Sequence, residues 1–311
     1  MKKNKSNFRI DIVIIFIVLL LGPATGLILS KTNIIEQFEF LDMLVPEIDV
    51  YEQIIPFNED EIVFSSSKSS HLESLLDQIK LDYKTVTDLG SIPNFGLLSL
   101  PKDLSNIEPI SRRKTIFFSS ILPLIVKSNI DILNDRKILC EAIKNNDSKT
   151  KLEIAQKYYI DLSKIEKLMI DKTLIRKIDV VPISLIMAQA AAESGWGTSR
   201  FALEGNALFG QWTWDKSKGI EPKFASDQKA AVRKFNNLSD SVLSYLINLN
   251  THNAYSSMRA KRNRNCNQKK LISGYELANW MGNYAVTRDE YIKLLRSIIK
   301  KNNLDALDDL I

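Results

Sequence analysis

Cysteine and histidine are scarce in this chain. Its 311 residues contain two of each, namely Cys140, Cys266, His71 and His252. A structural zinc site needs about four such ligands brought together, and Cys–His catalysis needs a base beside the thiol. The sequence therefore predicts no metal site, no catalytic cysteine and no cofactor. An oxidising compartment would permit a bond between Cys140 and Cys266, but the sequence leaves this pairing open.

A strong excess of one charge is also lacking. The net charge is +5 and the pI is about 8.9, which suits attraction to an anionic cell envelope but is too mild to indicate a nucleic-acid partner. The main basic cluster runs from Arg259 to Asn265 and continues at Lys269 and Lys270. Because no aromatic residues interrupt it, we expect a solvated loop, with contact to an anionic wall polymer as the alternative.

Long uncharged runs are confined to the N-terminal end. Ile12 to Leu29 carries no charge and follows Lys2, Lys3, Lys5 and Arg9. Such a run is just long enough to span a bilayer, and the basic flank predicts a cytoplasmic N-terminus. We expect a single-pass anchor in the bacterial cytoplasmic membrane, with the rest of the chain in the periplasm or outside. The alternative is a signal peptide, cleaved near Ala24, that leaves a secreted or periplasmic protein.

The most informative segment lies in the middle of the chain. Pro182 suits a helix start, and the residues from Ile183 to Ala192 are apolar nearly all round, which is typical of a buried helix. Gly195 and Gly197 then end the helix. Glu193 is thereby placed in the last turn, where exposed carbonyl groups and apolar neighbours disfavour a negative charge. We expect a raised pKa at Glu193, as a general acid requires.

Two ordered motifs resemble those of a known family. They are Ala188-Gln189-Ala190-Ala191-Ala192-Glu193-Ser194-Gly195-Trp196-Gly197 and Gly205-Asn206-Ala207-Leu208-Phe209-Gly210. They resemble the glucosaminidase family of peptidoglycan hydrolases, glycoside hydrolase family 73. The segments from Ile121 to Val126 and from Leu249 to Tyr255 are similar to its Bax-like bacterial branch. The resemblance covers roughly residues 110–297 and implies a lysozyme-like fold.

The resemblance also implies roles for single residues. The family's catalytic acid corresponds to Glu193, and its cleft tyrosine corresponds to Tyr284 in Gly282-Asn283-Tyr284-Ala285. Candidates for sugar contacts are Trp196, Asn206, Gln211, Trp212 and Trp214; core packing or turn formation is the competing interpretation of each. Candidates for a second carboxylate are Glu221 and Asp227, with Glu204 and Asp215 nearby. The acetamide of the substrate can also replace a second carboxylate.

The fold class predicted is α+β and mainly helical: a lysozyme-like domain with a small β-lobe. We expect three parts: a basic tip and anchor over residues 1–31, a stalk or small N-terminal region over 32–112, and the catalytic domain over 113–311. In the second part, we expect a strand over Glu61 to Phe64 and a helix that starts at a capping box, Ser70 to Glu73. In the third part, Leu208 to Trp214 and Ala230 to Phe235 are expected to pair as strands.

Five further helices are expected around this lobe. They cover Ile116 to Leu139 (packed, and interrupted at Pro123), Lys151 to Tyr159, Leu162 to Met169 (capped by Asp161), Val242 to Leu249 (capped by Asp240) and Asp289 to Ile299, with a shorter one around Leu277 to Met281.

The leading hypothesis is therefore a membrane-anchored endo-β-N-acetylglucosaminidase that cleaves peptidoglycan glycan strands. The nearest alternative is a lytic transglycosylase, which shares the implied fold and a single glutamate. A third hypothesis is a non-catalytic peptidoglycan-binding or scaffold protein.

Overall fold

The structure is a computed structural model that describes residues 62–88, 92–222, 230–264, 266–268 and 271–311. The predicted anchor or signal peptide, residues 32–61 and 89–91 of the predicted stalk or small N-terminal region, and the candidate carboxylate Asp227 lie outside these residues. The α-helices are α3 (Ser69–Gln78), α4 (Ile110–Lys144), α5 (Ser148–Lys157), α6 (Ile170–Lys177), α7 (Ile183–Ser194), α8 (Arg200–Gly205), α9 (Leu238–Thr251), α10 (Ser256–Arg262), α11 (Gly274–Leu277) and α12 (Asp289–Lys301).

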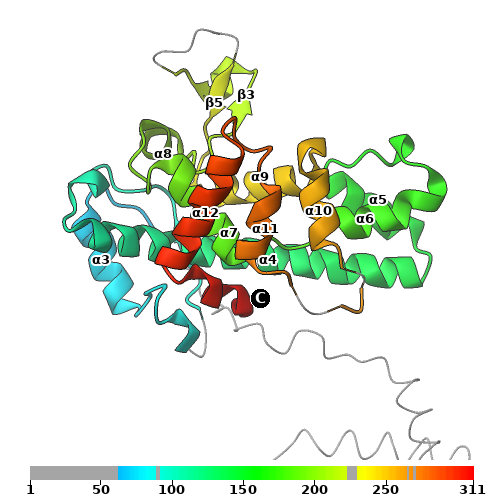
Figure 1. The fold of residues 1–311 in the computed structure, drawn as a ribbon, viewed down its shortest axis with the longest axis horizontal. Helices are drawn as coiled ribbons and strands as arrows, with labels where there is room; N and C mark the ends of the chain where they lie inside the picture. The colour runs from blue at the N-terminus through cyan, green and yellow to red at the C-terminus, as the bar shows by residue number, and fades with distance from the viewer. Residues whose placement is uncertain (1–61, 89–91, 223–229, 265, 269–270) are drawn as a thin grey trace, which may run out of the picture. The chain divides into compact units, whose positions relative to one another are not determined.

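The strands are short and fall into two sheets. They are β1 (Ile62–Phe64), β2 (Phe95–Leu97), β3 (Trp212–Thr213), β4 (Gly219–Ile220) and β5 (Ala231–Arg233). Short 3-10 turns are η1 (Val86–Asp88), η2 (Leu104–Asn106), η3 (Leu162–Lys164), η4 (Lys167–Met169), η5 (Lys216–Lys218), η6 (Asn253–Tyr255), η7 (Ala278–Trp280) and η8 (Leu304–Leu310). The predicted class, mainly helical α+β, agrees with this composition, and the arrangement fits a lysozyme-like domain (Figure 1).

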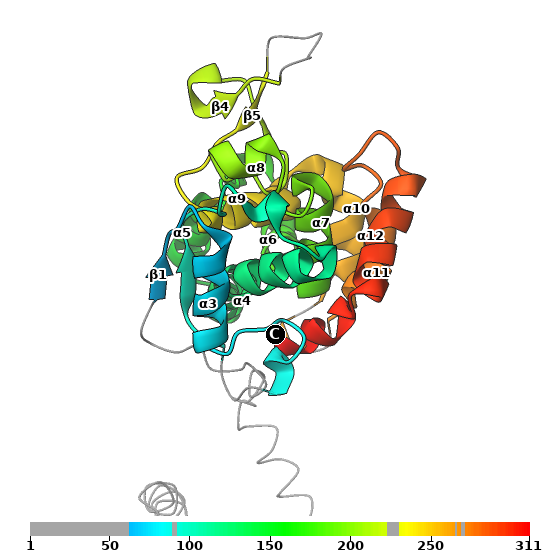
Figure 2. The same cartoon turned by 90° about the vertical axis from the view of Figure 1, so that its left-hand side faces the viewer.

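Helix α4 runs through the helical body, and α3, α5, α6, α7 and α9 all contact it (Figure 2). Contrary to expectation, Pro123 does not interrupt this helix, which continues from Ile110 to Lys144. By length and composition α4 could cross a membrane, but 83% of its most apolar 18-residue window is buried inside the fold. This confirms the expected packed helix, because the other helices cover its apolar surface.

Residues 62–88 and 92–112 pack onto the same core. Strand β1, predicted from the sequence, pairs in parallel with β2, with Ile62 opposite Phe95. Helix α3 begins at Ser69, and no side chain of its own segment caps it, so the predicted capping box is wrong. Instead, Asp103 accepts a hydrogen bond of 2.7 Å from the Ser69 amide. The proposed boundary at residue 113 falls within the first turn of α4.

Helix α7 forms as predicted, with Pro182 as its N-cap and Gly195 as its left-handed C-cap. Nearly all of its side chains are buried, among them Leu185, Ile186 and Met187. Asp308 accepts hydrogen bonds of 2.8 Å from both the amide and the hydroxyl of Ser184, and so satisfies an otherwise unpaired amide at the start of the helix. Contacts with α4, α11, α12 and η8 fix the helix that carries Glu193.

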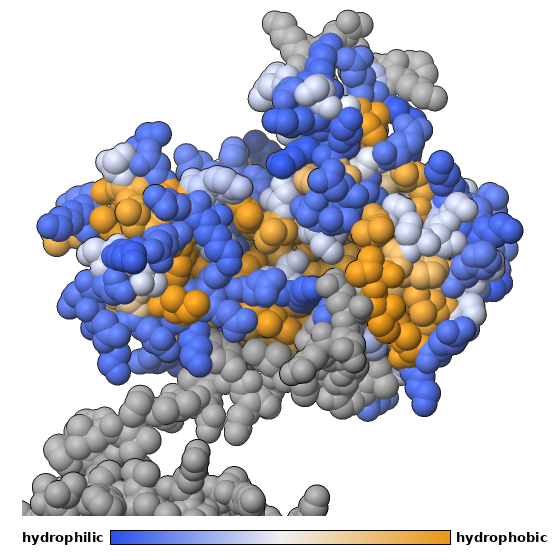
Figure 3. Space-filling model, turned by 180° about the vertical axis from the view of Figure 1, so that it is seen from behind, coloured by the Kyte–Doolittle hydropathy of each residue, from blue (hydrophilic) through white to orange (hydrophobic). Residues whose placement is uncertain are grey.

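The predicted β-lobe is also present. Strand β5 lies between β3 and β4 and is antiparallel to both, with Trp212 opposite Val232 and Ile220 opposite Val232 on the other side. Asp215 caps the turn η5 by accepting a hydrogen bond from the Ser217 amide. Figure 3 shows this lobe as a mainly hydrophilic projection from the helical body.

The basic cluster after α9 is not a solvated loop. Arg259, Arg262 and Arg264 are only 3%, 2% and 8% exposed. Arg264 forms a buried ion pair with Asp179, and Arg262 donates to the Asn250 side chain at 2.7 Å. The prediction was wrong because charge alone does not reveal that a carboxylate and several carbonyl groups far along the chain receive these guanidinium groups. Cys266 then forms a disulfide with Cys140 of α4, with 5.9 Å between their Cα atoms, which settles the open pairing.

Three other helix predictions need correction. The segment from Leu162 to Met169 forms two 3-10 turns, η3 and η4, although Asp161 does cap the first of them. Helix α9 starts earlier than expected, and its N-cap is Asn237, whose side chain accepts from the amide of Asp240. The helix expected near Leu277 is α11 followed by η7. The final amphipathic helix, α12, forms as predicted.

Candidate active site

The turn after α7 places the Glu193 side chain by a set of local bonds. Ser194 accepts a hydrogen bond of 2.8 Å from the Gly197 amide, and the Trp196 amide donates to the Ala191 carbonyl at 2.9 Å. Gly195 and Gly197 have positive φ values of 59° and 77°. A Cβ atom on Gly197 would lie 2.7 Å from Leu100 and 2.8 Å from Phe117, so only glycine fits there.

Glu193 is half-buried in the last turn of α7. Burial raises the pKa of its carboxyl group, and a hydrogen bond with Tyr291 lowers this pKa in part. Its Oε2 atom lies beside the backbone of Gly210, where an added Cβ atom would be 3.5 Å away. The structure therefore brings together the two sequence motifs, and gives Glu193 the raised pKa that the sequence predicts.

Three buried polar side chains support Glu193. The Tyr245 hydroxyl of α9 donates to Oε1 of Gln189, and Nε2 of Gln189 donates to the Tyr291 hydroxyl at 3.0 Å. Tyr291 in turn hydrogen-bonds with Glu193. Gln189 is fully buried and lies one helical turn before Glu193. This series of hydrogen bonds ties α9, α7 and α12 to the carboxyl group and fixes its position.

Tyr284 lies in the same aromatic cluster but does not bond to Glu193. Its hydroxyl donates to the Phe209 carbonyl at 2.7 Å, and its ring stacks on Tyr291 with 5.7 Å between the ring centroids. Burial, followed by the neighbouring Tyr245 and Glu193, raises the pKa of Tyr284. The contact of Tyr284 with substrate stays a prediction, and in the structure its hydroxyl holds the loop that carries Gly210.

Trp196 packs against the helical body. Its ring meets Phe118 edge to face at 5.1 Å between centroids, and the Lys114 ammonium lies over the ring at 4.2 Å from its centroid. The Trp196 ring is therefore packed against two residues of α4, Phe118 and Lys114. These contacts favour the packing interpretation over sugar stacking.

The other candidates for sugar contacts lie in and around the β-lobe. Asn206 ends α8 and donates to the Phe235 carbonyl at 3.2 Å, which favours the turn interpretation. Gln211 and the exposed Trp212 line a groove of about 770 Å³ beside α9. Trp214 lies beyond the end of β3 and is 78% exposed, so the strand expected over Leu208 to Trp214 ends before it.

No second carboxylate of the described residues lies close enough to Glu193 to shift its pKa, since burial and Tyr291 are the causes of that shift. Glu221 is exposed and pairs with Lys216 at 3.0 Å, Glu204 pairs with Arg200 at 3.3 Å, and Asp215 pairs with Lys218 at 3.2 Å. Within the described ranges there is also no cluster of three potential metal ligands.

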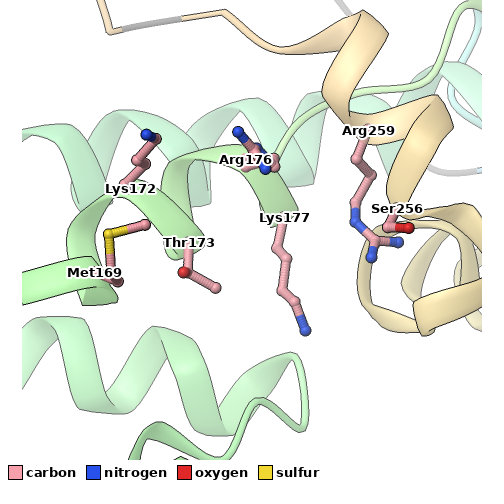
Figure 4. A pocket seen from close by; sticks show the side chains of 7 residues that line it. All are labelled: Met169, Lys172, Thr173, Arg176, Lys177, Ser256 and Arg259. Atoms are coloured by element: carbon pink, nitrogen blue, oxygen red, sulfur yellow. The ribbon is translucent and has the colours of Figure 1, made fainter. Parts of the chain in front are cut away.

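A separate basic pocket of about 230 Å³ lies between α6 and α10 (Figure 4). Lys177 and Arg259 point to the same side of it in this view. Lys177 donates to the Thr251 carbonyl at 3.2 Å, and Arg259 donates to the carbonyls of Leu249 and His252 at 2.8 Å. These two cations therefore satisfy carbonyl groups at the C-terminal end of α9.

Sequence reasoning missed Tyr291 and Gln189, although both carry a signal. Tyr291 lies one and two turns before Leu295 and Ile298 on the buried face of α12, and Gln189 is the sole amide in the apolar helix α7. Buried tyrosine and glutamine side chains need hydrogen-bond partners. Which partners they have depends on how α7, α9 and α12 pack, and this packing is not visible in the sequence.

A mainly helical body, a small β-lobe and one half-buried carboxyl group with a raised pKa are together typical of glycoside hydrolases of the lysozyme-like kind. Residues 172–304 match the glucosaminidase family model, described as mannosyl-glycoprotein endo-beta-N-acetylglucosaminidase. The chain is also 29% identical over 209 residues to the protein bax of Escherichia coli (strain K12), a match that covers 66% of this chain and 74% of that protein. No solved structure matches the chain significantly. These two matches support a chain of the glucosaminidase family that is Bax-like.

Proposed function

We propose that this protein is a peptidoglycan hydrolase, an endo-β-N-acetylglucosaminidase in which Glu193 is the general acid. The observation that carries the proposal is the position of Glu193: half-buried, with a raised pKa, beside Gly210 of the second motif. A carboxyl group that keeps its proton near neutral pH can protonate the glycosidic oxygen as the bond breaks. Family membership supports glycoside hydrolysis in general.

The group that completes the reaction is proposed to come from the substrate. Because no described carboxylate is among the groups that shift the pKa of Glu193, the acetamide of N-acetylglucosamine is the preferred nucleophile. Tyr284 would assist only after a rearrangement, since its hydroxyl proton is already donated to the Phe209 carbonyl. In this scheme Glu221 is a surface residue that takes no part in the reaction, because it forms an ion pair with Lys216.

The same observation favours one alternative, a lytic transglycosylase, because such an enzyme also works with a single glutamate. The two reactions give different products. A glucosaminidase leaves reducing N-acetylglucosamine ends, whereas a transglycosylase leaves anhydro-muramyl ends, and mass spectrometry of the digestion products separates them.

The experiment that tests the proposal is digestion of purified sacculi by the Glu193→Gln variant. This substitution keeps the shape of the side chain and removes the acid, so muropeptide release should fall to background. Glu204→Gln is the matched control, because Glu204 is an exposed glutamate of α8 whose ion-pair partner among the described residues is Arg200. Undiminished release by Glu193→Gln would refute the assignment. Binding of sacculi by the wild type without any product would instead favour a scaffold protein.

We also propose that the catalytic domain, residues 113–311, acts outside the cytoplasmic membrane and is held there by the segment from Ile12 to Leu29. The disulfide between Cys140 and Cys266 supports this location, because such bonds persist mainly in oxidising compartments. Protease treatment of spheroplasts should then degrade the domain, whereas a cytoplasmic domain would survive.

A further inference from the structure

The basic pocket between α6 and α10 shares no lining residue with the hydrogen-bonded group around Glu193. Its volume is about 230 Å³, and four cations line it: Lys172, Arg176, Lys177 and Arg259 (Figure 4). None of the described residues that line it is acidic. Drug-sized ligands occupy pockets of about 300–1,000 Å³, so this pocket suits a smaller molecule. The lining therefore favours a small ligand with a negative charge.

Two carboxylates on the pocket's own and neighbouring helices are paired elsewhere. Asp171, next to Lys172 in α6, pairs with Lys151 of α5 at 3.0 Å. Glu276 of α11 pairs with Lys261 of α10, also at 3.0 Å. No ion pair joins any of the four pocket cations to a carboxylate in the described part of the chain. An anion in the pocket would supply the negative charge that these groups lack.

The pocket cations also repel one another. Burial, followed by the charge of Arg259, lowers the pKa of Lys177. Burial, followed by the charge of Arg176, lowers the pKa of Arg259. Like charges close together disfavour their charged forms in this way. An anion bound between α6 and α10 would relieve this repulsion, so the fold with the anion should be more stable than the fold without it.

The two arginines have N–H groups left for a ligand. The Nε atom of Arg176 is buried and has no hydrogen-bond partner among the described residues. Arg259 makes its two bonds to carbonyl groups at the end of α9 through Nη1, although a guanidinium group carries five N–H donors. These donors form a planar fork that matches the oxygen atoms of a phosphate group. The hydroxyl groups of Thr173 and Ser256, which also line the pocket, can donate to further oxygen atoms.

We propose that this pocket binds the phosphate group of a small phosphate ester. Arg176 and Arg259 supply the N–H donors, and the two lysines of α6 supply further positive charge. The Met169 side chain, which also lines the pocket, gives the organic part of the ester an apolar contact. The site goes beyond the proposed function and does not depend on it, because it uses none of the residues around the catalytic carboxyl group. The ester can be a soluble compound or the headgroup of a phospholipid, and the test separates these two sources.

The test uses the full chain in a non-ionic detergent, because the segment from Ile12 to Leu29 is expected to be an anchor. The probe is sn-glycerol 3-phosphate, and the controls are glycerol and sodium chloride at matched ionic strength. Hydrogen exchange followed by mass spectrometry should become slower in α6 and α10 with the phosphate ester only, and should stay the same in α12. Exchange in α6 and α10 that the ester leaves unchanged, or that sodium chloride slows equally, would overturn the inference.

The variants Lys172→Gln and Arg176→Gln measure the contribution of each charge. The dissociation constant for the ester should rise about two- to fivefold in Lys172→Gln, because Lys172 is exposed, and about tenfold or more in Arg176→Gln, which loses a charged hydrogen bond. Lys177 and Arg259 stay unchanged, since they also bond to carbonyl groups of α9 and its end. Lys167→Gln is the matched control, because Lys167 is an exposed lysine of η4 that does not line the pocket. Wild-type affinity in both variants, or an equal loss in Lys167→Gln, would overturn the inference.

A second arm of the experiment distinguishes the two sources of phosphate. The full chain is placed in vesicles of phosphatidylcholine alone and in vesicles that also contain phosphatidylglycerol. Slower exchange of α6 and α10 with phosphatidylglycerol, reduced in Arg176→Gln but not in Lys167→Gln, would support the pocket and assign it to a lipid headgroup. Slower exchange with the soluble ester but not with phosphatidylglycerol would support the pocket and assign it to a soluble compound. No effect of either probe would overturn the inference, and would leave the glycosidase assignment intact.

Discussion

Tyr291 of α12 hydrogen-bonds with the carboxyl group of Glu193 at the end of α7. Burial and the charge of Glu193 both raise the pKa of Tyr291, so its hydroxyl keeps its proton and acts as the donor. The Tyr291 oxygen in turn accepts from Gln189, whose own carbonyl oxygen accepts from Tyr245. All three bonds run in one direction, toward the carboxylate. This arrangement stabilises the ionised form of Glu193 against the effect of burial.

Replacing Tyr291 by phenylalanine should therefore raise the pKa of Glu193 further, because burial remains and the bond that opposes it is lost. The basic limb of the kcat/KM profile should move to higher pH, and kcat should fall because the carboxyl group is held less firmly. Profiles of peptidoglycan digestion against pH would measure both effects. Tyr275→Phe is the control, since the Tyr275 ring contacts Arg296 and Lys300 instead. An unaltered pH profile in Tyr291→Phe would contradict the positioning role.

The wild-type enzyme should itself show the raised pKa. A general acid works only while it is protonated, so activity should be present at pH values below the pKa of Glu193 and should be lost as pH rises through it. Because burial raises this pKa, the loss should occur at a higher pH than for an ordinary, solvent-exposed glutamate. Initial rates at low substrate concentration across a pH series would test this. A limb centred at the ordinary value would show that Glu193 is solvated during the reaction.

Gly210 offers a test of the space beside the acid. Gly210→Ala puts a methyl group about 3.5 Å from Oε2 of Glu193, at a residue whose φ is +59°. The left-handed backbone should cost about 1 kcal/mol of stability, and the methyl group should occupy space needed by the substrate. Gly195→Ala is a matched control: it has the same φ, but its Cβ would meet only Thr198 and Ser199.

Thermal unfolding and digestion rates together separate the two effects. Both variants should lose similar stability, whereas Gly210→Ala should lose much more activity. Equal losses of activity would mean that backbone strain alone is responsible, and that the second motif does not form a wall of the catalytic site.

The local features of the site could be predicted from the sequence, whereas the long-range ones could not. The start and the end of α7 could be predicted because Pro182 and Gly195 set them through their own backbone conformations. The apolar run between them predicts that the helix is buried. Asp103, by contrast, caps α3 although it lies 34 residues away in the sequence. The Ser70–Glu73 pattern lies within α3 itself and does not cap it. The partners of Tyr291 and Arg264 likewise come from distant elements. Periodicity places such residues on a buried face, but it does not say which groups meet there.

The buried charges around Asp179 give a prediction on stability. Asp179 is 1% exposed and pairs with Arg264, while Nε of Arg136 lies 3.7 Å from its Oδ1. Burial alone would raise the pKa of Asp179, but the Arg264 hydrogen bond and the charges of Arg262 and Arg136 hold it below the ordinary value. The contribution of Asp179 to stability is therefore present above the pKa it has in the unfolded chain and is lost as pH falls through the lower value in the fold.

Asp179→Asn should destabilise the fold by about 3–5 kcal/mol, because it removes one partner of the buried ion pair with Arg264. Asp171→Asn should cost less than about 1 kcal/mol, since Asp171 forms a more exposed pair with Lys151. Chemical denaturation at neutral pH would measure both, and the gap between Asp179→Asn and the wild type should narrow in acid as Asp179 itself becomes protonated. A small loss in Asp179→Asn at neutral pH would mean that carbonyl groups, such as those of Ile175 and Ile178 that accept from Arg136, compensate for the cluster without the carboxylate.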